Sequence, residues 1–555
     1  MLKFAFYLHF WYNECQIRSE KMAKTYTAEE LQKCDKEMLA AIILSMQDQI
    51  TTMNHNMEKL IEQIAAANNH RYGQKSEKMD VIDGQLNLFN EPEMLTECLY
   101  VLEPEAEDVI QPKRKKQPGK REEDLKNLPV EVIRHSVPNE TLEETFGASG
   151  WKQLPDEIYK RVRVQPAVYT VEEHHVEVYA GKDNQTILKA DRPKSLLRNS
   201  IVTPSLAASI MNAKYVNGMP IYRISLEFMR NDIHISKQVM ANWMIQCGER
   251  YFAILYDYLH EILCSYHVIQ ADETPCNVAK DGRPANSKSY MWVYRTGKTY
   301  KDRPVILYDY ERTRKAEHPQ EFLKGFKGVV VTDGYSAYQK IDKENPDIVF
   351  AGCYAHCRRK FSDVLKGLKG KQKENAKTTV AYQALQQIAA IYHLDNSYSE
   401  LPPEERLKMR QLTVKPQVEA FFAWAKQMVE SNSISSEMTL KGLHYCINHE
   451  ENLKVFLNDP DVPMDNNETE ASLRSFCLHK HAWKVIDTIE GAKASAIIYS
   501  ITETAKANGL NPFRYMEYLL TELMEHLDDT DRSFLDNLLP WSETLPDICR
   551  SNQQQ

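Results

Sequence analysis

Two aspartates, Asp272 and Asp333, each end an apolar run that is typical of a buried strand. The first run, VIQAD, follows His267, and the second, GVVVTD, begins at Gly328. An aspartate after a strand is also a common turn residue, so either one alone would indicate little about function. As a pair, their carboxylates are the hard oxygen ligands that Mg²⁺ and Mn²⁺ prefer. The pair therefore favours a divalent-metal site for phosphoryl transfer.

The elements around these aspartates predict how the two come together. Two further strands are expected over 289–295 and 304–310, a helix over 316–326 and a last strand over 348–353. Three strands in a meander, followed by strands reached through helices, have the order of the ribonuclease-H-like fold. That fold has a mixed five-stranded sheet with helices, and its first and fourth strands are neighbours. We therefore expect a multidomain α+β chain whose α/β catalytic core brings both aspartates to adjacent strand ends.

A third carboxylate is expected from residues 463–474, PMDNNETEASLR, which are typical of a helix capped by Asp465. Two-metal sites need such a group, usually from a helix packed on the sheet. Glu468 lies three residues after Asp465 and is expected to complete a capping box. Glu470 lies about 200° around the helix from Glu468, on the face of Leu473. Glu470 is therefore the predicted metal ligand.

Five segments resemble, in the same order, those of the insertion sequence 66 family of bacterial transposases. They are ADETP (271–275), TDGYSAY (332–338), AGCYAHCRRKF (351–361), PMDNNETEASLR (463–474) and IIYSITETAKANGLNP (497–512). The resemblance extends from about residue 30 to about residue 530. It implies a DDE transposase with a ribonuclease-H-like core, in which Asp272, Asp333 and Glu470 are the catalytic and metal-binding residues.

The resemblance also implies a reaction and its partners. Two Mg²⁺ (or Mn²⁺) ions per active site would support nicking at the ends of an insertion sequence and strand transfer into target DNA. No nucleotide cofactor is expected, because the chain has no glycine-rich phosphate loop. The family's elements often encode small accessory proteins, which are expected as partners in addition to DNA.

The chain departs from the family pattern at two places. Family members usually carry a zinc-ribbon-like module with paired cysteines, but residues 126–160 contain no cysteine, so no zinc is predicted. Cys353, His356 and Cys357 lack a fourth ligand nearby and are interpreted as structural. Ala471 stands where the family typically has Arg. Three alternatives therefore remain: a decayed or accessory copy that binds element ends without cutting, a helix-turn-helix regulator, or a nuclease of the same fold.

The cations are clustered although the formal net charge is −9. Residues 77–108 alone carry ten acidic side chains and one basic one, so the rest of the chain is neutral overall. A run over 358–377 has a net charge of +6 and is either a phosphate-binding track or a solvated helix. Trp483 either stacks on a base or fills the core. The predicted DNA-binding residues are Arg358, Arg359, Lys360, Arg474, Lys480 and Lys484.

The N-terminal region predicts self-association. Apolar residues repeat every seven positions from Leu39 to Leu60, and a second set follows four residues after each, from Ile43 to Ile64. This pattern predicts a coiled coil and hence a homo-oligomer, with an amphipathic helix packed on its own core as the alternative. Residues 1–21 contain a short aromatic patch and are interpreted as untranslated, with the start at Met22; the alternative is a start at Met1 with the patch as an anchor. No apolar run is long enough for a membrane span, and the eleven cysteines show no disulfide framework, so a bacterial cytoplasmic, nucleoid-associated location is expected.

Composition and periodicity divide the chain into eight regions. They are an N-terminal helix (1–68), a charged flexible linker (69–125), a small β-rich module (126–200), a helical helix-turn-helix-like DNA-binding region (201–262), the first part of the catalytic core (263–365), a helical insertion (366–460), the last part of the core with the third carboxylate (461–515) and a C-terminal helical tail (516–555). Within the fourth region, Ser236 is the expected N-cap of the second helix of the pair.

Deleting residues 22–68 is expected to convert a self-associated protein into a monomer, because the seam from Leu39 to Ile64 supplies the predicted contact. Light scattering on the full and shortened chains measures the mass of each. An unchanged mass would contradict the coiled coil and favour a helix packed on its own core.

Overall fold

The computed structural model describes residue 140 and residues 169–550, apart from gaps at 181–186, 192, 285–286, 298, 336, 339, 342–344, 369–375 and 432–433. The predicted coiled coil, the charged linker and most of the β-rich module lie outside the described residues. The chain forms two compact units. The described residues of 329–467 belong to one, called here the inserted unit, and the described residues of 169–328 and 468–550 belong to the other, called the flanking unit.

A five-stranded mixed sheet has the strand order β6-β5-β3-β7-β8. Its strands are β3 (Val268–Cys276), β5 (Ser289–Thr296), β6 (Ile306–Glu311), β7 (Gly328–Thr332) and β8 (Ile348–Gly352). The pairs β3–β5 and β5–β6 are antiparallel, and Asp272 lies opposite Val293. The expectation that the first and fourth strands are neighbours is confirmed, since these are β3 and β7.

The strands of the flanking unit are long apolar runs because both of their faces are covered. In β5, Met291, Trp292, Val293 and Tyr294 are all fully buried, so the polar and apolar residues do not alternate. Helix α21 (Ile489–Ala507) packs against β6. Its hydroxyls Ser500 Oγ and Thr504 Oγ1 accept the backbone N–H groups of Tyr308 (2.7 Å) and Ile306 (3.0 Å). The edge of the sheet at β6 is therefore bonded to α21.

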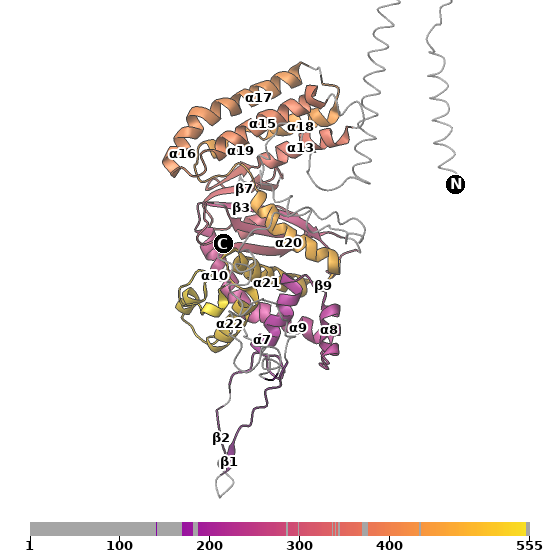
Figure 1. Ribbon diagram of the computed structural model, residues 1–555, viewed down its shortest axis with the longest axis vertical. Coiled ribbons are helices and arrows are strands. Elements are labelled where there is room, and N and C mark those ends of the chain that lie inside the picture. Colours follow the sequence, from indigo (N-terminus) through magenta and orange to yellow (C-terminus); the bar gives the residue numbers. More distant parts are fainter. Residues whose placement is uncertain are drawn as a thin grey trace, which may run out of the picture. The chain divides into compact units, whose positions relative to one another are not determined.

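Helices α9, α10 and α22 of the flanking unit pack on α21, and α7 packs on α9 and α22 (Figure 1). The bounds in this unit are α7 (Pro204–Met211), α8 (Ile221–Arg230), α9 (Lys237–Cys247), α10 (Ala253–Cys264), α11 (Glu317–Phe322), α20 (Asn467–Trp483) and α22 (Pro512–Glu525). Two small pairs of strands complete it, antiparallel β1 (Val178–Ala180) with β2 (Ile187–Lys189) and parallel β4 (Val278–Lys280) with β9 (Ile486–Thr488). No helix in the described part of the chain could cross a lipid bilayer.

The expected pair of helices in the helix-turn-helix-like region is present as α8 and α9. Ser236 Oγ accepts the N–H of Val239, which confirms the predicted N-cap of α9. Asp232 in the connecting turn has φ of +58°, a conformation in which aspartate is more easily accommodated than most side chains.

Helices dominate the inserted unit. Figure 1 shows α13, α15, α17 and α18 packed side by side. The bounds are α13 (Tyr354–Gly367), α15 (Val380–Asn396), α16 (Pro403–Met409), α17 (Lys415–Glu430), α18 (Glu437–Asn448) and α19 (Glu450–Lys454). Their apolar faces meet at residues such as Ile388, Phe421 and Leu443, which are fully buried.

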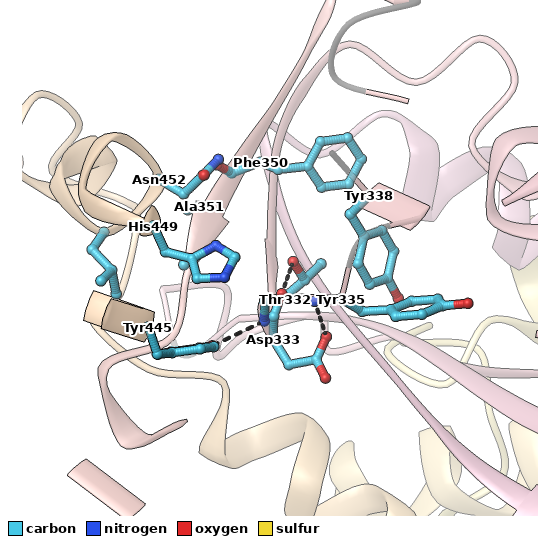
Figure 2. A pocket seen from close by; sticks show the side chains of 12 residues that line it. Thr332, Asp333, Tyr335, Tyr338, Phe350, Ala351, Tyr445, His449 and Asn452 are labelled. Atoms are coloured by element: carbon cyan, nitrogen blue, oxygen red, sulfur yellow. Dashed lines mark hydrogen bonds between the residues drawn. The ribbon is translucent and has the colours of Figure 1, made fainter. Parts of the chain in front are cut away.

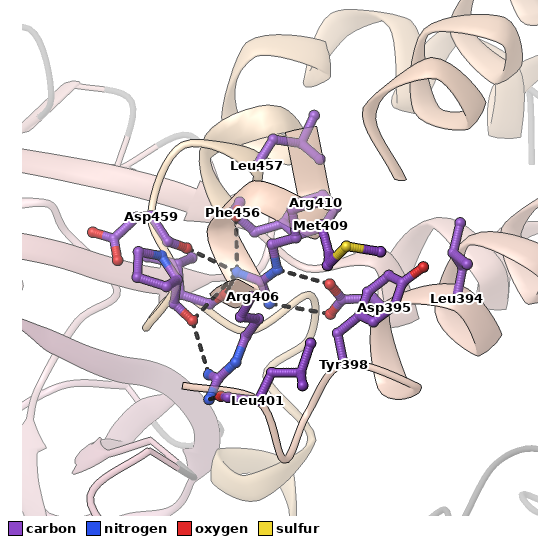
Figure 3. Close-up of polar contacts among 12 residues, drawn as sticks. Leu394, Asp395, Tyr398, Leu401, Arg406, Met409, Arg410, Phe456, Leu457 and Asp459 are labelled. Atoms are coloured by element: carbon purple, nitrogen blue, oxygen red, sulfur yellow. Dashed lines mark hydrogen bonds and ion pairs between the residues drawn. The ribbon is translucent and has the colours of Figure 1, made fainter. Parts of the chain in front are cut away.

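A buried arginine fastens one loop of the inserted unit to these helices (Figure 3). Arg410 is 3% exposed, and its Nε and Nη2 bind the carboxylate of Asp395 on α15 at 2.7 and 3.1 Å. Its Nη1 lies within hydrogen-bonding distance of the carbonyls of Phe456 (2.9 Å), Asp459 (2.8 Å) and Val462 (3.0 Å). The guanidinium of Arg410 and the carboxylate of Asp395 are both removed from water, so each needs the other as its counter-charge. The pair keeps Arg410 in the position from which it binds the carbonyls of the loop over 456–462.

Replacing Arg410 with Met is expected to lower the free energy of unfolding by about 3–5 kcal/mol, because Asp395 would stay buried without a counter-charge. Urea unfolding followed by circular dichroism measures the loss. The matched control is Lys441→Met, which breaks a surface pair with Glu437 whose side chains are 71% and 54% exposed. The control should change stability by less than about 0.5 kcal/mol, and equal losses in the two variants would contradict the assignment.

Candidate active site

Asp272 lies on the face of β3 that helix α20 covers. Successive side chains of a strand point to opposite faces, so Gln270, Asp272 and Thr274 share one face and Glu273 lies on the other. The Glu273 side chain is 1% exposed and pairs with Arg314. Asp272 Oδ1 accepts the N–H of Glu273 at 2.8 Å, which helps to orient the carboxylate. Of the two adjacent carboxylates, Asp272 is the one on the α20 side.

Helix α20 is bonded to that face of β3 at three levels. Thr469 Oγ1 lies 3.2 Å from Gln270 Oε1, and Cys477 Sγ lies 3.4 Å from Thr274 Oγ1. Lys480 Nζ donates to the carbonyl of Pro275 at 2.7 Å. Asp272 comes between Gln270 and Thr274 along the strand. The helix therefore runs along β3 past the position of Asp272.

A second set of contacts joins α20 to β5 and fixes the rotation of the helix. Arg295 of β5 donates to Glu468 Oε2 at 2.9 Å, to the Glu468 carbonyl at 2.8 Å and to Ser472 Oγ at 2.9 Å. The Arg295 side chain is 11% exposed. Burial lowers the pKa of Arg295, and the charge of Glu468 opposes that shift. Glu468 is thus the counter-ion of a largely buried arginine.

Glu470 lies on the opposite side of α20 from Glu468. At about 100° per residue, Glu470 is about 200° from Glu468 and about 20° from Cys477, which touches β3. The helix begins at Asn467, one residue later than predicted, and Asp465 Oδ1 accepts the N–H of Asn467 at 3.2 Å. The ion pair of Glu468 with Arg295 is a contact that the capping interpretation did not foresee. Glu470 therefore belongs to the β3 side of the helix.

Asp333 belongs to the inserted unit and follows β7 beside a pocket of about 20 Å³ (Figure 2). Asp333 Oδ1 accepts the N–H of Tyr335 at 2.9 Å, and the N–H of Gly334 donates to Tyr445 Oη at 3.1 Å. A Cβ at Gly334 would lie 2.6 Å from Tyr445 Oη and 2.9 Å from His449 Nε2, so this position tolerates only glycine without a shift. Burial lowers the pKa of His449, and the nearby Asp333 opposes this.

The three carboxylates are the right donors for Mg²⁺ or Mn²⁺, which prefer oxygen ligands. Among the described residues, no group of three or more His, Cys, Asp or Glu side chains is arranged to hold a metal ion. Cys353, His356 and Cys357 are not such a group: Cys353 Sγ accepts the N–H of Asn466 at 3.2 Å. Burial and the neighbouring Cys446 raise the pKa of Cys357. These thiols lie in the interior of the inserted unit.

The predicted DNA-binding residues lie on two helices and one turn. Arg358, Arg359 and Lys360 belong to α13, Arg474 and Lys480 to α20, and Lys484 to the turn after α20, where its φ is +61°. Lys360 and Lys484 are exposed and the other four are half-buried. The Trp483 ring lies 4.5 Å from Lys214 Nζ and packs near Tyr499. These contacts with Lys214 and Tyr499 favour a role of Trp483 in packing within the protein over a role in stacking on a DNA base.

Sequence reasoning missed two charged groups of the sheet, Arg295 and Asp309. Burial, followed by the charge of Glu311, raises the pKa of Asp309 to about 7, and Lys493 opposes the shift. The signal was available in the sequence, because an aspartate inside the apolar run PVILYDY is expected to be desolvated. Arg295 carried no such signal, since its partner lies 173 residues away.

Replacing Glu468 with Gln is expected to lower the free energy of unfolding by about 1–2 kcal/mol, because Arg295 would lose its counter-ion. Replacing Glu470 with Gln should leave stability within about 0.5 kcal/mol of the parent, as this change is isosteric and leaves Arg295 paired. Thermal unfolding of the two variants in parallel checks the difference. A larger loss at Glu470 would show that the roles of the two glutamates are reversed.

Three family models match this chain. The family model "Transposase IS66 family" matches residues 199–494, "IS66 C-terminal element" matches 500–541, and "Transposase C of IS166 homeodomain" matches 59–133. Two similar proteins of Sinorhizobium fredii (strain NBRC 101917 / NGR234) are the uncharacterized proteins y4qI and y4hP. The first is 26% identical over 88% of this chain and 89% of the relative, and the second is 25% identical over 71% and 72%. The resemblance seen in the sequence motifs is confirmed, and the chain belongs to the IS66 family of transposases.

Proposed function

We propose that this chain is an active DDE transposase, which cuts DNA at the ends of a bacterial insertion sequence and joins those ends to target DNA. Membership of the family supports the transposase function. The observation that supports the catalytic assignment is the position of α20. Its contacts with Gln270 and Thr274 put Glu470 on the β3 side of the helix, above the strand face that carries Asp272.

The proposed catalytic residues are Asp272, Asp333 and Glu470, which would hold two Mg²⁺ (or Mn²⁺) ions. The adjacency of β3 and β7 in the sheet order supports a ribonuclease-H-like core that joins the two aspartates. When bound, such ions polarise the scissile phosphate and lower the pKa of the attacking water. The chain's own groups position the carboxylates: the N–H of Glu273 orients Asp272, the N–H of Tyr335 orients Asp333, and Arg295 holds α20 at the rotation that directs Glu470.

The proposed reaction has two phosphoryl transfers. In the first, water attacks a phosphodiester at the element's end, the P–O3′ bond breaks, and a free 3′-hydroxyl is left. In the second, that 3′-hydroxyl attacks a phosphodiester of the target, a new P–O bond forms and the target's own 3′-oxygen leaves. No protein group becomes covalently attached to DNA. The six cations named above would bind phosphates, and the N-terminal coiled coil and small accessory proteins would assemble the complex.

Asp272→Asn, Asp333→Asn and Glu470→Gln are each expected to reduce Mg²⁺-dependent DNA cleavage at least about 100-fold, because each change removes a negatively charged metal ligand. Cleavage of supercoiled plasmid with and without a chelator measures the effect. DNA binding and folding should stay nearly intact in all three variants.

Glu468→Gln is the matched control. Its amide oxygen, the backbone carbonyl of residue 468 and Ser472 Oγ can all still accept from Arg295, so the rotation of α20 and the cleavage activity should be kept below the melting temperature. Activity in Glu470→Gln together with loss in Glu468→Gln would overturn the assignment of the third carboxylate. A parent chain that binds element ends but never cuts would instead support the decayed-copy alternative.

A further inference from the structure

Helix α9 presents a row of amide side chains on its outer surface. Gln238, Asn242 and Gln246 are spaced four residues apart, so they line up on one side of the helix, and all three are exposed. The opposite side carries Met240, Trp243, Met244 and Cys247, which are buried. An exposed stripe of three amides without an interspersed charge is unusual for a surface that only needs to be soluble.

The scaffold holds α9 in place, and within the described part of the chain this stripe stays exposed. The inner side of α9 packs on α7 and α21. Gly248, directly after α9, lies so close to α21 that a Cβ there would be 3.3 Å from Ala494 Cβ. Because α21 is also bonded to the edge of the sheet, α9 is positioned by the same helix that supports the catalytic core. A site built on such a rigid element can read a ligand with precise geometry.

We propose that α9 is the sequence-reading helix of this transposase, and that Gln238 and Asn242 bind adenine bases in the DNA major groove. This inference rests on the proposed function and names the element that would choose its DNA. Asparagine and glutamine form paired hydrogen bonds with N6 and N7 of adenine, an edge that only the major groove displays. The exposed Val239, next to them, offers an apolar contact for a thymine methyl group.

The dimensions of the helix match this role. From Gln238 to Gln246 the helix rises about 12 Å, which corresponds to three or four base pairs at about 3.4 Å each. The major groove is about 12 Å wide and admits one helix. Lys237 and Arg250 are exposed at the two ends of the stripe, about 20 Å apart, where the phosphate backbones would pass. The preceding helix α8 and its tight turn complete the two-helix plan of many DNA-binding domains.

The test is a selection from a library of random-sequence duplexes with the full chain at moderate salt. The parent should enrich a motif that contains adenine at two fixed positions. Gln238→Ala and Asn242→Ala should each relax one of these positions and weaken binding to the selected duplex about 5- to 150-fold. Affinity for an unrelated duplex and the melting temperature should not change.

The matched control is Gln383→Ala, an exposed amide of α15 in the inserted unit, which should select the same motif as the parent. The proposal is overturned if both α9 variants enrich the parent's motif with the parent's affinity, as they would if this face bound a protein. It is also overturned if they lose affinity equally for every sequence, as expected for phosphate contacts alone. Selection of the motif without cutting would refute the catalytic proposal and keep this one, whereas cutting without any selected motif would do the reverse.

Discussion

The ion pair between Arg295 and Glu468 fixes the rotation of α20 about its own axis, and the direction of Glu470, the proposed third catalytic carboxylate, depends on that rotation. Arg295 makes three hydrogen bonds to the first turns of the helix, and its side chain is almost fully removed from solvent. Turning the helix by one residue, about 100°, would break all three bonds and leave the guanidinium buried without a counter-charge. Glu470 lies two residues after Glu468, so this ion pair sets the direction of the Glu470 side chain although Glu470 is not part of the pair.

Helix α21 connects three parts of the flanking unit. Its hydroxyls bind the backbone of β6, Ser495 lies 3.1 Å from the hydroxyl of Tyr215, and its small residue Ala494 lets the turn at Gly248 approach closely. Ser500 and Thr504 belong to the motif IIYSITETAKANGLNP (497–512), and their contacts with β6 explain why hydroxyl residues stand at these two positions. In the described part of the chain, the backbone groups on the outer edge of β6 have no neighbouring strand to bond with. A helix that packs there must therefore offer short side-chain donors and acceptors at the spacing of those backbone groups.

Local chemistry was sufficient to predict several features. The strands around Asp272 and Asp333 were recognisable because they are continuous apolar runs, and Ser236 because a hydroxyl before a helix is a favourable cap. The opposite orientations of Glu468 and Glu470 follow from helix geometry alone. Other features could not be predicted because they join distant positions. Arg410 and Arg295 are ordinary surface residues by type, and only the fold shows that each is buried against partners elsewhere in the chain.

The hydrogen bonds between α21 and β6 also prevent a further strand from adding to the sheet at β6. An edge strand with unpaired N–H groups is a template to which a strand of another molecule can attach. Here the hydroxyls of Ser500 and Thr504 already accept the outward-facing N–H groups of Tyr308 and Ile306. Sheet extension between two copies is therefore blocked at this edge. If several copies assemble on one DNA molecule, as proposed above, growth of the sheet past β6 cannot supply the contacts that join them.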